Sequence, residues 1–241
     1  GGEGGQGVVY LVSGGKLAVK LLKNTSSENR DSLRVKLEEV RRLPLEDLLL
    51  AKPLQMLAKP MVGYVMELFT EMQSLSKLIF PGKNKNPLEY YIQSGGLKRR
   101  LKILAKVADT LSKMHSRSLV YGDPSPNNIF ISEDPNYSEM RLIDADNICY
   151  TTQRGQEVIY TPRYGAPEVV LGKSSVNTLT DTYAFAVILF ETLTFVHPLL
   201  GDHIIDGPPD LEEEAFKGQY PWIEDTHDPS NKTVRGLERE N

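Results

Sequence analysis

The alternation of apolar and polar positions divides the chain into a strand-rich front part and a helix-rich back part. The front part has short apolar runs bounded by Gly-rich or polar turns, which is typical of strands. These predicted strands lie at 8–12, 17–22 and 62–67. Between them, apolar residues recur at helical spacing through 31–43, and Pro44 stands just beyond the last turn of this predicted helix.

The back part is dominated by two helical patterns on either side of a hairpin. An amphipathic helix is predicted from Leu97 to His115, and a second, more apolar helix over 181–195. The apolar face of the first helix is predicted to contain Leu101, Leu104, Val107, Ala108, Leu111 and Met114. Two apolar runs within 121–144 predict the hairpin. A strand-rich front and a helix-rich back predict an α+β fold of two lobes with a cleft between them.

Composition limits the possible classes of function. The chain has 241 residues, enough for one large domain or two small lobes, and a formal net charge of −4 without a long basic stripe, which argues against nucleic-acid binding. The single cysteine, Cys149, excludes an internal disulfide and fits a reducing, cytoplasmic location. No apolar run approaches the roughly 18 residues of a membrane span, and no signal peptide is recognised. Because the chain opens on Gly-Gly, we expect flanking domains to be missing.

Three polar residues around the hairpin carry the clearest chemistry. Asp123 and Asn128 lie five positions apart just before the first apolar run, and Asp144 ends the second. Each residue alone is also common in turns. Together, they supply a possible proton acceptor, Asp123, and two oxygen ligands for a hard cation, Asn128 and Asp144. Phosphoryl transfer needs such a set, because its transition state is handled mainly by positioning and charge neutralisation.

The front part adds groups that suit phosphate binding. The pattern Gly2-x-Gly4-x-x-Gly7-x-Val9 lies between two strand signals, and glycines allow a turn to present backbone N–H groups to phosphates. A strand, not a helix, follows it, which disfavours a dinucleotide-binding fold. Lys20 ends the next strand run, and Glu39 on the predicted helix is preferred to Glu38 as its ion-pair partner.

With these motifs in order, the chain resembles a eukaryotic-type Ser/Thr protein kinase domain almost end to end, similar to a divergent group of bacterial kinases. The resemblance implies a small β-rich N-lobe with one helix, a hinge, and a larger α-helical C-lobe. These regions are expected at 1–66, 67–74 and 75–241. It also implies ATP and Mg²⁺ as cofactors and a protein hydroxyl as the substrate. The segment Thr161–Glu168 resembles the peptide-docking segment of that family, and Asp181 resembles the aspartate that braces the catalytic loop.

The resemblance assigns roles residue by residue. Asp123 is expected to act on the substrate hydroxyl, Lys20 to hold the phosphates in an ion pair with Glu39, and Asn128 and Asp144 to bind Mg²⁺. The remaining expected ATP contacts are Gly2, Gly4, Gly7, Val9, Ala18, Met66, Glu67, Leu68 and Phe130.

Five positions depart from the family pattern. Tyr121 and Gly122 stand where the family has His and Arg. That Arg receives an activation-loop phosphate, so activity is expected not to depend on this phosphorylation. Ser125 replaces a Lys that neutralises the transferring phosphate, and Arg163 is a candidate substitute. Ala145 replaces a large apolar anchor, whose space Tyr121 is expected to fill in part. Asp146 replaces a Gly, and either a solvent-facing turn residue or a role at the metal site fits the sequence.

Two other readings remain open on the sequence alone. A pseudokinase that only binds nucleotide is favoured by the replacements at Tyr121, Gly122, Ser125 and Ala145. A small-molecule kinase of related fold fits the Asp-Asn-Asp set, although the peptide-docking segment argues against it. The tail after Pro198 resembles the family poorly, and no Arg stands out as a partner for Glu168.

Overall fold

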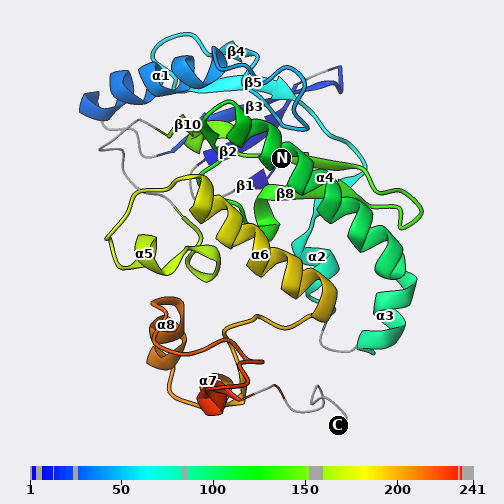
Figure 1. Ribbon diagram of the computed structural model, residues 1–241. Coiled ribbons are helices and arrows are strands. Elements are labelled where there is room, and N and C mark those ends of the chain that lie inside the picture. Colours follow the sequence, from blue (N-terminus) through cyan, green and yellow to red (C-terminus); the bar gives the residue numbers. More distant parts are fainter. Residues whose placement is uncertain are drawn as a thin grey trace.

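The computed structural model describes residues 2–3, 7–12, 14–23, 27–82, 86–151, 160–232 and 234. It has the bilobal α+β architecture expected from the sequence, with a β-sheet and one helix at one end and a group of helices at the other (Figure 1).

The N-terminal sheet is antiparallel, with the strand order β1-β2-β3-β5-β4. Its strands are β1 (Gly2–Glu3), β2 (Gly7–Leu11), β3 (Leu17–Leu22), β4 (Gln55–Met56) and β5 (Gly63–Glu67). Gly14 and Gly15 turn the chain between β2 and β3 with φ of 109° and 76°, values that glycine adopts without strain. In the central strand β3, Lys20 lies opposite Val9 of β2 and Tyr64 of β5, so these three side chains share one face of the sheet.

The helix α1 (Ser27–Arg41) covers part of this sheet. It begins four residues before the predicted start and ends two residues before the predicted end. The early end is consistent with Pro44, because a proline disfavours helical geometry in the residue before it. Leu37 is 1 % exposed and packs with Tyr64 of β5, as the helical spacing of apolar residues predicts.

The helical part consists of one long central pair and several short helices. The helices are α2 (Ser76–Ile79), α3 (Pro87–Gln93), α4 (Gly96–Ser116), α5 (Pro167–Val170), α6 (Thr178–Thr194), α7 (Asp202–Ile205) and α8 (Asp210–Phe216). In Figure 1, α4 and α6 run side by side through the middle of the molecule, and these helices contact each other. Their contact forms the centre of the main hydrophobic core.

The buried face of α4 agrees with the predicted one at four positions, Leu104, Val107, Leu111 and Met114. It differs at Leu101, which is 48 % exposed, and at Ile103 and Arg100, which are fully buried. The Arg100 guanidinium donates to the carbonyl of Thr192 at 3.0 Å and lies 3.8 Å from the centre of the Tyr91 ring. A simple apolar pattern does not predict a buried arginine with these partners.

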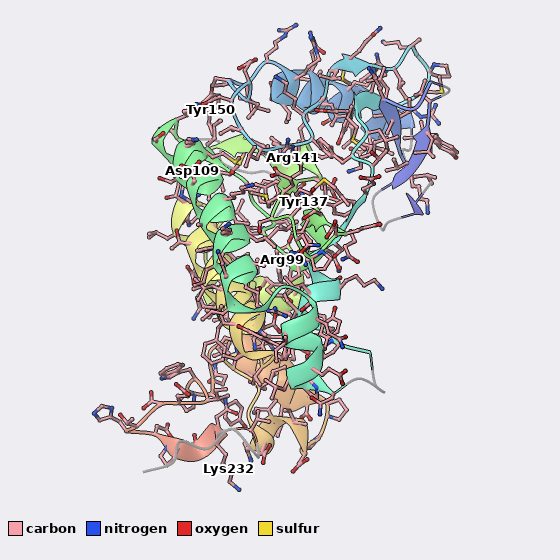
Figure 2. The ribbon with its side chains drawn as sticks, turned by 90° about the vertical axis from the view of Figure 1, so that its right-hand side faces the viewer. Arg99, Asp109, Tyr137, Arg141, Tyr150 and Lys232 are labelled. Carbon is pink, nitrogen blue, oxygen red and sulfur yellow. The ribbon has the colours of Figure 1, made fainter. Side chains whose placement is uncertain are left out.

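Two small sheets contain the strands that flank residues 121–128 and 143–148. The strands β6 (Met72–Ser74), β8 (Ile129–Ser132) and β9 (Met140–Leu142) form an antiparallel sheet in the order β6-β8-β9, while β7 (Leu119–Val120) pairs with β10 (Cys149–Tyr150). The predicted hairpin is therefore confirmed as β8-β9. Figure 2 shows Arg99 of α4 and Tyr137 of the β8-β9 loop, which are joined by a 2.9 Å hydrogen bond from Nε to the carbonyl oxygen.

The C-terminal part forms a small core of its own. Leu200, Ile204, Ala215 and Phe216 pack together between α7 and α8. The side chain of Asn231 is fully buried and bonds to the backbone of Gly201, Leu199 and Pro221 at 2.8–3.0 Å. No helix within the described ranges is long and apolar enough to span a membrane.

Candidate active site

The carboxylate of Asp181 holds the beginning of the loop between β7 and β8 in place. Asp181, in the first turn of α6, is fully buried and accepts hydrogen bonds from the backbone N–H groups of Tyr121 and Gly122 at 2.7 and 2.9 Å. Nε2 of His115 lies 3.0 Å from the same carboxylate. The predicted bracing role of Asp181 is thus confirmed by its contacts.

Gly122 has a backbone reason to be glycine. Its φ is 90°, and a Cβ at this position would lie 3.1 Å from the carbonyl oxygen of Asn147. A side chain here would therefore be strained and crowded at once. The replacement of the family Arg by Gly122 thus occurs at a position whose backbone favours glycine in this chain.

Asp123 is held by groups from two segments. One carboxylate oxygen accepts the backbone N–H of Thr161 at 2.7 Å, and the other accepts the amide of Asn128 at 3.0 Å. Burial raises the pKa of the Asp123 carboxyl above its ordinary range, although the hydrogen bonds from Thr161 and Asn128 oppose the shift. A carboxylate offers about four lone pairs, so each oxygen retains acceptor capacity for a further donor.

Asn128 presents its two amide atoms to different surroundings. Its amide nitrogen donates to both the side chain and the backbone carbonyl of Asp123, each at 3.0 Å. The amide oxygen is then directed away from Asp123, which suits a ligand for a hard cation. The sequence prediction that Asp123 and Asn128 act together is supported by this contact.

Lys20 lies between two carboxylates that follow β9. Its ammonium bonds to Oδ1 of Asp144, and to Oδ2 of Asp146 at 2.5 Å. Asp144 has φ of 64°, a left-handed conformation that Asp tolerates better than most residues. Burial lowers the pKa of Lys20, but the charges of Asp146 and Asp144 outweigh it, so the pKa is raised overall. Burial also raises the pKa of Asp144.

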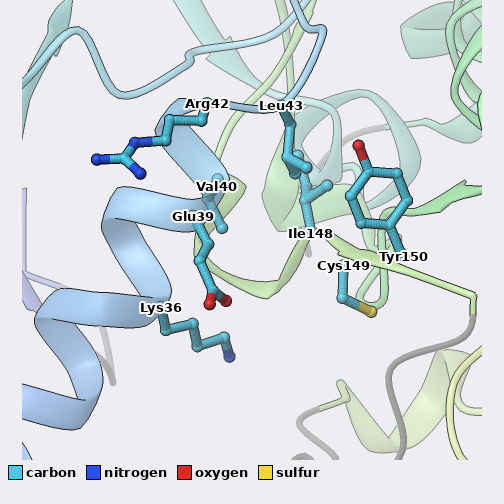
Figure 3. A pocket seen from close by; sticks show the side chains of 8 residues that line it. All are labelled: Lys36, Glu39, Val40, Arg42, Leu43, Ile148, Cys149 and Tyr150. Carbon is cyan, nitrogen blue, oxygen red and sulfur yellow. The ribbon is translucent and has the colours of Figure 1, made fainter.

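The expected pair of Lys20 with Glu39 is not formed, which corrects the sequence prediction. Glu39 is exposed, and it lines a pocket of about 330 Å³ between α1 and the segment 148–150, together with Lys36, Cys149 and Tyr150 (Figure 3). Within the described part of the chain, the ion pairs of Lys20 are those with Asp144 and Asp146. Glu38 also points elsewhere, because its carboxylate pairs with Arg41 at 2.6 Å.

The structure brings several predicted nucleotide contacts to the same part of the N-terminal sheet. Val9 lies opposite Lys20, and Met66 lies opposite the fully buried Ala18. At Gly7, a Cβ would lie 2.7 Å from the carbonyl oxygen of Leu21, so only glycine fits that close approach of β2 to β3.

The other predicted contacts lie at the borders of this region. Glu67 ends β5, the backbone N–H of Leu68 donates to the carbonyl of Lys16 at 3.0 Å, and Phe130 lies on β8, opposite Arg141. Gly2 lies in the short strand β1. Gly4 lies outside the described residues.

The remaining departures from the family pattern have structural explanations. Ser125 is 1 % exposed, and its hydroxyl has no hydrogen-bond partner among the described residues. Tyr121 and Ala145 are both buried in the main core, and the Tyr121 hydroxyl donates to the carbonyl of Ile143, beside the turn that carries Asp144. Asp146 is 6 % exposed, so its interpretation as a solvent-facing turn residue is wrong.

The proposed substitute cation, Arg163, is engaged elsewhere. Its guanidinium pairs with Glu191 of α6 and Glu212 of α8, each at 3.1 Å, and the neighbouring Tyr164 hydroxyl donates to Glu191 at 2.6 Å. Glu191 is 1 % exposed, whereas Glu168 is exposed. The docking segment is therefore anchored through Glu191. The signal in the sequence that points to Glu191 is its charge, which interrupts the apolar pattern of α6.

Comparisons with known proteins agree with this geometry. A family described as the protein kinase domain matches residues 2–232. The chain belongs to the protein kinase family. The match includes most of the tail, which the sequence analysis expected to resemble the family poorly.

Individual relatives of this kinase domain are distant. It is 26 % identical over 211 residues to a probable serine/threonine-protein kinase of Clostridium perfringens, covering 83 % of the chain and 29 % of that protein. It is 29 % identical over 243 residues to the serine/threonine-protein kinase pkn2 of Myxococcus xanthus, covering 89 % of the chain and 27 % of that protein. It is 28 % identical over 216 residues to a probable receptor-like protein kinase of Arabidopsis thaliana, covering 82 % and 40 %. The kinase domain thus spans less than half the length of each of these relatives.

The donor set of this kinase domain fits the cofactors that its family implies. No cluster of three or more His, Cys, Asp or Glu side chains in the described ranges is arranged to hold a metal alone. Mg²⁺ does not need such a cluster, because it is commonly bound by one or two carboxylates together with substrate phosphates. Asp144 and the amide oxygen of Asn128 provide oxygen ligands of this kind, and Lys20 provides a cation for phosphates.

Proposed function

We propose that this domain is an ATP-dependent Ser/Thr protein kinase that transfers the γ-phosphate to a protein hydroxyl. The observation that carries the proposal is the arrangement of Asp123, whose carboxylate is positioned by Asn128 and by the docking segment at Thr161. When bound, Mg·ATP supplies the phosphoryl group and neutralises its charge.

Each residue has a role that follows from its contacts. Asp123 orients the substrate hydroxyl and accepts its proton on a carboxylate oxygen, a task that a raised pKa favours. Asn128 and Asp144 hold the metal, and Lys20 faces the phosphates from the same sheet face as Val9. The anchored segment 161–164 supports a peptide substrate, because it lies directly against Asp123.

Regulation by an activation-loop phosphate is not expected. Gly122 has no side chain to receive the phosphate, and the docking segment is already anchored by the Arg163–Glu191 pair. Activity that survives phosphatase treatment supports this, and activity abolished by it contradicts it.

The test is a single-turnover assay with labelled Mg·ATP, on the protein itself and on a broad peptide set. Wild type is expected to transfer phosphate, and Asp123→Asn and Lys20→Met to lose transfer. Asp109→Asn is the matched control, because Asp109 lies on the exposed side of α4 and its ion pair in the described ranges is with Lys113 of its own helix. Absence of transfer by wild type on every substrate overturns the proposal.

A pseudokinase is the second candidate, and two observations favour it. Lys20 is held by two carboxylates, and the buried, uncharged Ser125 stands where the family has a cation close to the transferring phosphate. Nucleotide binding by calorimetry without detectable turnover would select this function.

A further inference from the structure

Lys20 and Tyr64 are cross-strand neighbours, and both reach toward the same carboxylate. They form a residue pair between β3 and β5, so their side chains leave the sheet on the same face. The Lys20 ammonium lies 2.5 Å from Oδ2 of Asp146, and the Tyr64 hydroxyl donates to Oδ1 at 2.6 Å. Each oxygen of Asp146 therefore has its own partner from the sheet.

The contact of Lys20 with Asp146 is more buried than its contact with Asp144. Asp146 has a side chain that is 9 % exposed, compared with 23 % for Asp144, and Tyr64 is fully buried. A buried carboxylate needs a cation and hydrogen bonds to be stable, and Asp146 has both. Asp144 is the more open of the two to ligands from the cleft.

The path of the chain explains why the helix carboxylate is not used. Asp146 lies in the short 3₁₀ turn Ala145–Asn147, and this turn packs against α1. Glu39 is exposed and lines the pocket between this helix and the segment 148–150, which is shown in Figure 3. Asp146 from the turn, and not Glu39 from the helix, is thus the carboxylate in contact with Lys20.

We propose that Asp146, braced by Tyr64, is the positioning residue that holds the Lys20 ammonium toward the phosphates, in place of Glu39. This inference rests on the proposed kinase function. The two aspartates then have separate roles: Asp144 binds the metal, and Asp146 holds the Lys20 ammonium.

The kinetic test compares the two competing carboxylates. Asp146→Asn is expected to raise KM for ATP by about tenfold or more, since removing one partner of a buried charge pair leaves the other misplaced. Tyr64→Phe is expected to give a smaller increase in the same constant. Asp47→Asn, at an exposed pair with Arg117, is the matched control for the charge change. If Glu39→Gln raises KM for ATP as much as Asp146→Asn does, the proposal is overturned.

A second measurement needs no catalysis. Thermal unfolding without nucleotide is compared for wild type, Lys20→Met, Asp146→Asn and the double variant. Coupling through a direct contact predicts that the double variant shifts Tm by clearly less than the sum of the single shifts. The parallel cycle of Lys20→Met with Glu39→Gln is expected to be additive. Additive shifts for Asp146 overturn the proposal. If wild type transfers no phosphate, the kinase function fails, and this cycle still decides whether Asp146 holds Lys20.

Discussion

The backbone N–H of Thr161 donates a 2.7 Å hydrogen bond to the carboxylate of Asp123, which joins the docking segment directly to the proposed proton acceptor. Thr161 begins the segment that Glu191 anchors through Arg163 and Tyr164. The position of Asp123 therefore depends on α6 in two ways. Asp181 of α6 binds the backbone just before Asp123, and Glu191 of α6 anchors the segment that contacts the Asp123 carboxylate.

Removal of the proton acceptor is expected to affect chemistry and leave the fold intact. Asp123→Asn keeps the shape of the side chain but cannot accept the substrate proton, so kcat is expected to fall by about 10²- to 10⁴-fold. Tm is expected to remain within a few degrees of that of wild type. Retention of most of the activity by this variant would remove Asp123 from the mechanism.

The docking segment is expected to depend on Arg163. Among the described residues, Arg163→Met leaves the buried carboxylate of Glu191 with the Tyr164 hydroxyl as its remaining partner, which is expected to destabilise the protein by about 2 kcal/mol. We also expect kcat/KM for a peptide substrate to fall more than the affinity for ATP, because the segment contacts Asp123 and no phosphate site. Arg117→Met is the control, since its pair with the exposed Asp47 is expected to contribute less than about 1 kcal/mol. Equal effects of the two variants on peptide kinetics would contradict this role.

The glycine before the catalytic aspartate is expected to resist substitution. Gly122→Ala forces a side chain into a φ of 90° beside the Asn147 carbonyl, at an expected loss of about 1–2 kcal/mol in the free energy of unfolding. Gly82→Ala serves as the control, because a Cβ there meets no atom within 4 Å. Urea denaturation of both variants measures the difference. A neutral Gly122→Ala would show that the loop adapts freely.

Stability is expected to fall in mild acid because of His197. This ring is 4 % exposed, and burial lowers its pKa from 6.5 to about 4. Its Nδ1 accepts the N–H of Leu199 at 3.1 Å, so Nε2 carries the proton that bonds to the Arg163 carbonyl at 2.9 Å. The folded protein therefore requires the neutral ring.

The unfolded chain binds a proton at His197 below about pH 6.5, whereas the folded one does so only near pH 4. The free energy of unfolding should thus decrease as the pH falls from about 6.5 to 4, by up to about 3 kcal/mol. Chemical denaturation at pH 7 and pH 4.5, with His197→Gln as the comparison, measures this contribution. The same pH dependence in both proteins would exclude His197 as its source.

Patterns that are local in the sequence predicted most of the fold. The spacing of apolar residues predicted the α4 helix and the β8-β9 hairpin, and the order of motifs predicted that Asp123, Asn128 and Asp181 lie near one another, as they do. The Lys20 partner was predicted wrongly, because helical spacing gives the face of a residue but not the rotation of the helix against the sheet. Arg100 shows the same limit, since only its tertiary contacts explain why an arginine is fully buried in α4.

Asp146 could not be assigned from the sequence for a different reason. An aspartate two residues after a metal-binding aspartate fits a turn equally well, and its role depends on the β3-β5 register that places Tyr64 next to Lys20. The role of Glu191 likewise could not be predicted from the sequence, because it depends on the contact between α6 and the docking segment.

The buried side chain of Asn231 has a practical consequence for producing this domain. Its amide ties together three backbone positions around α7, and a Cβ at Gly201 would collide with the backbone of Asn231 and Lys232. A protein shortened to end before residue 231 would leave those backbone groups unsatisfied and open a gap beside the core between α7 and α8. The shortest stable expression length therefore has to include Asn231.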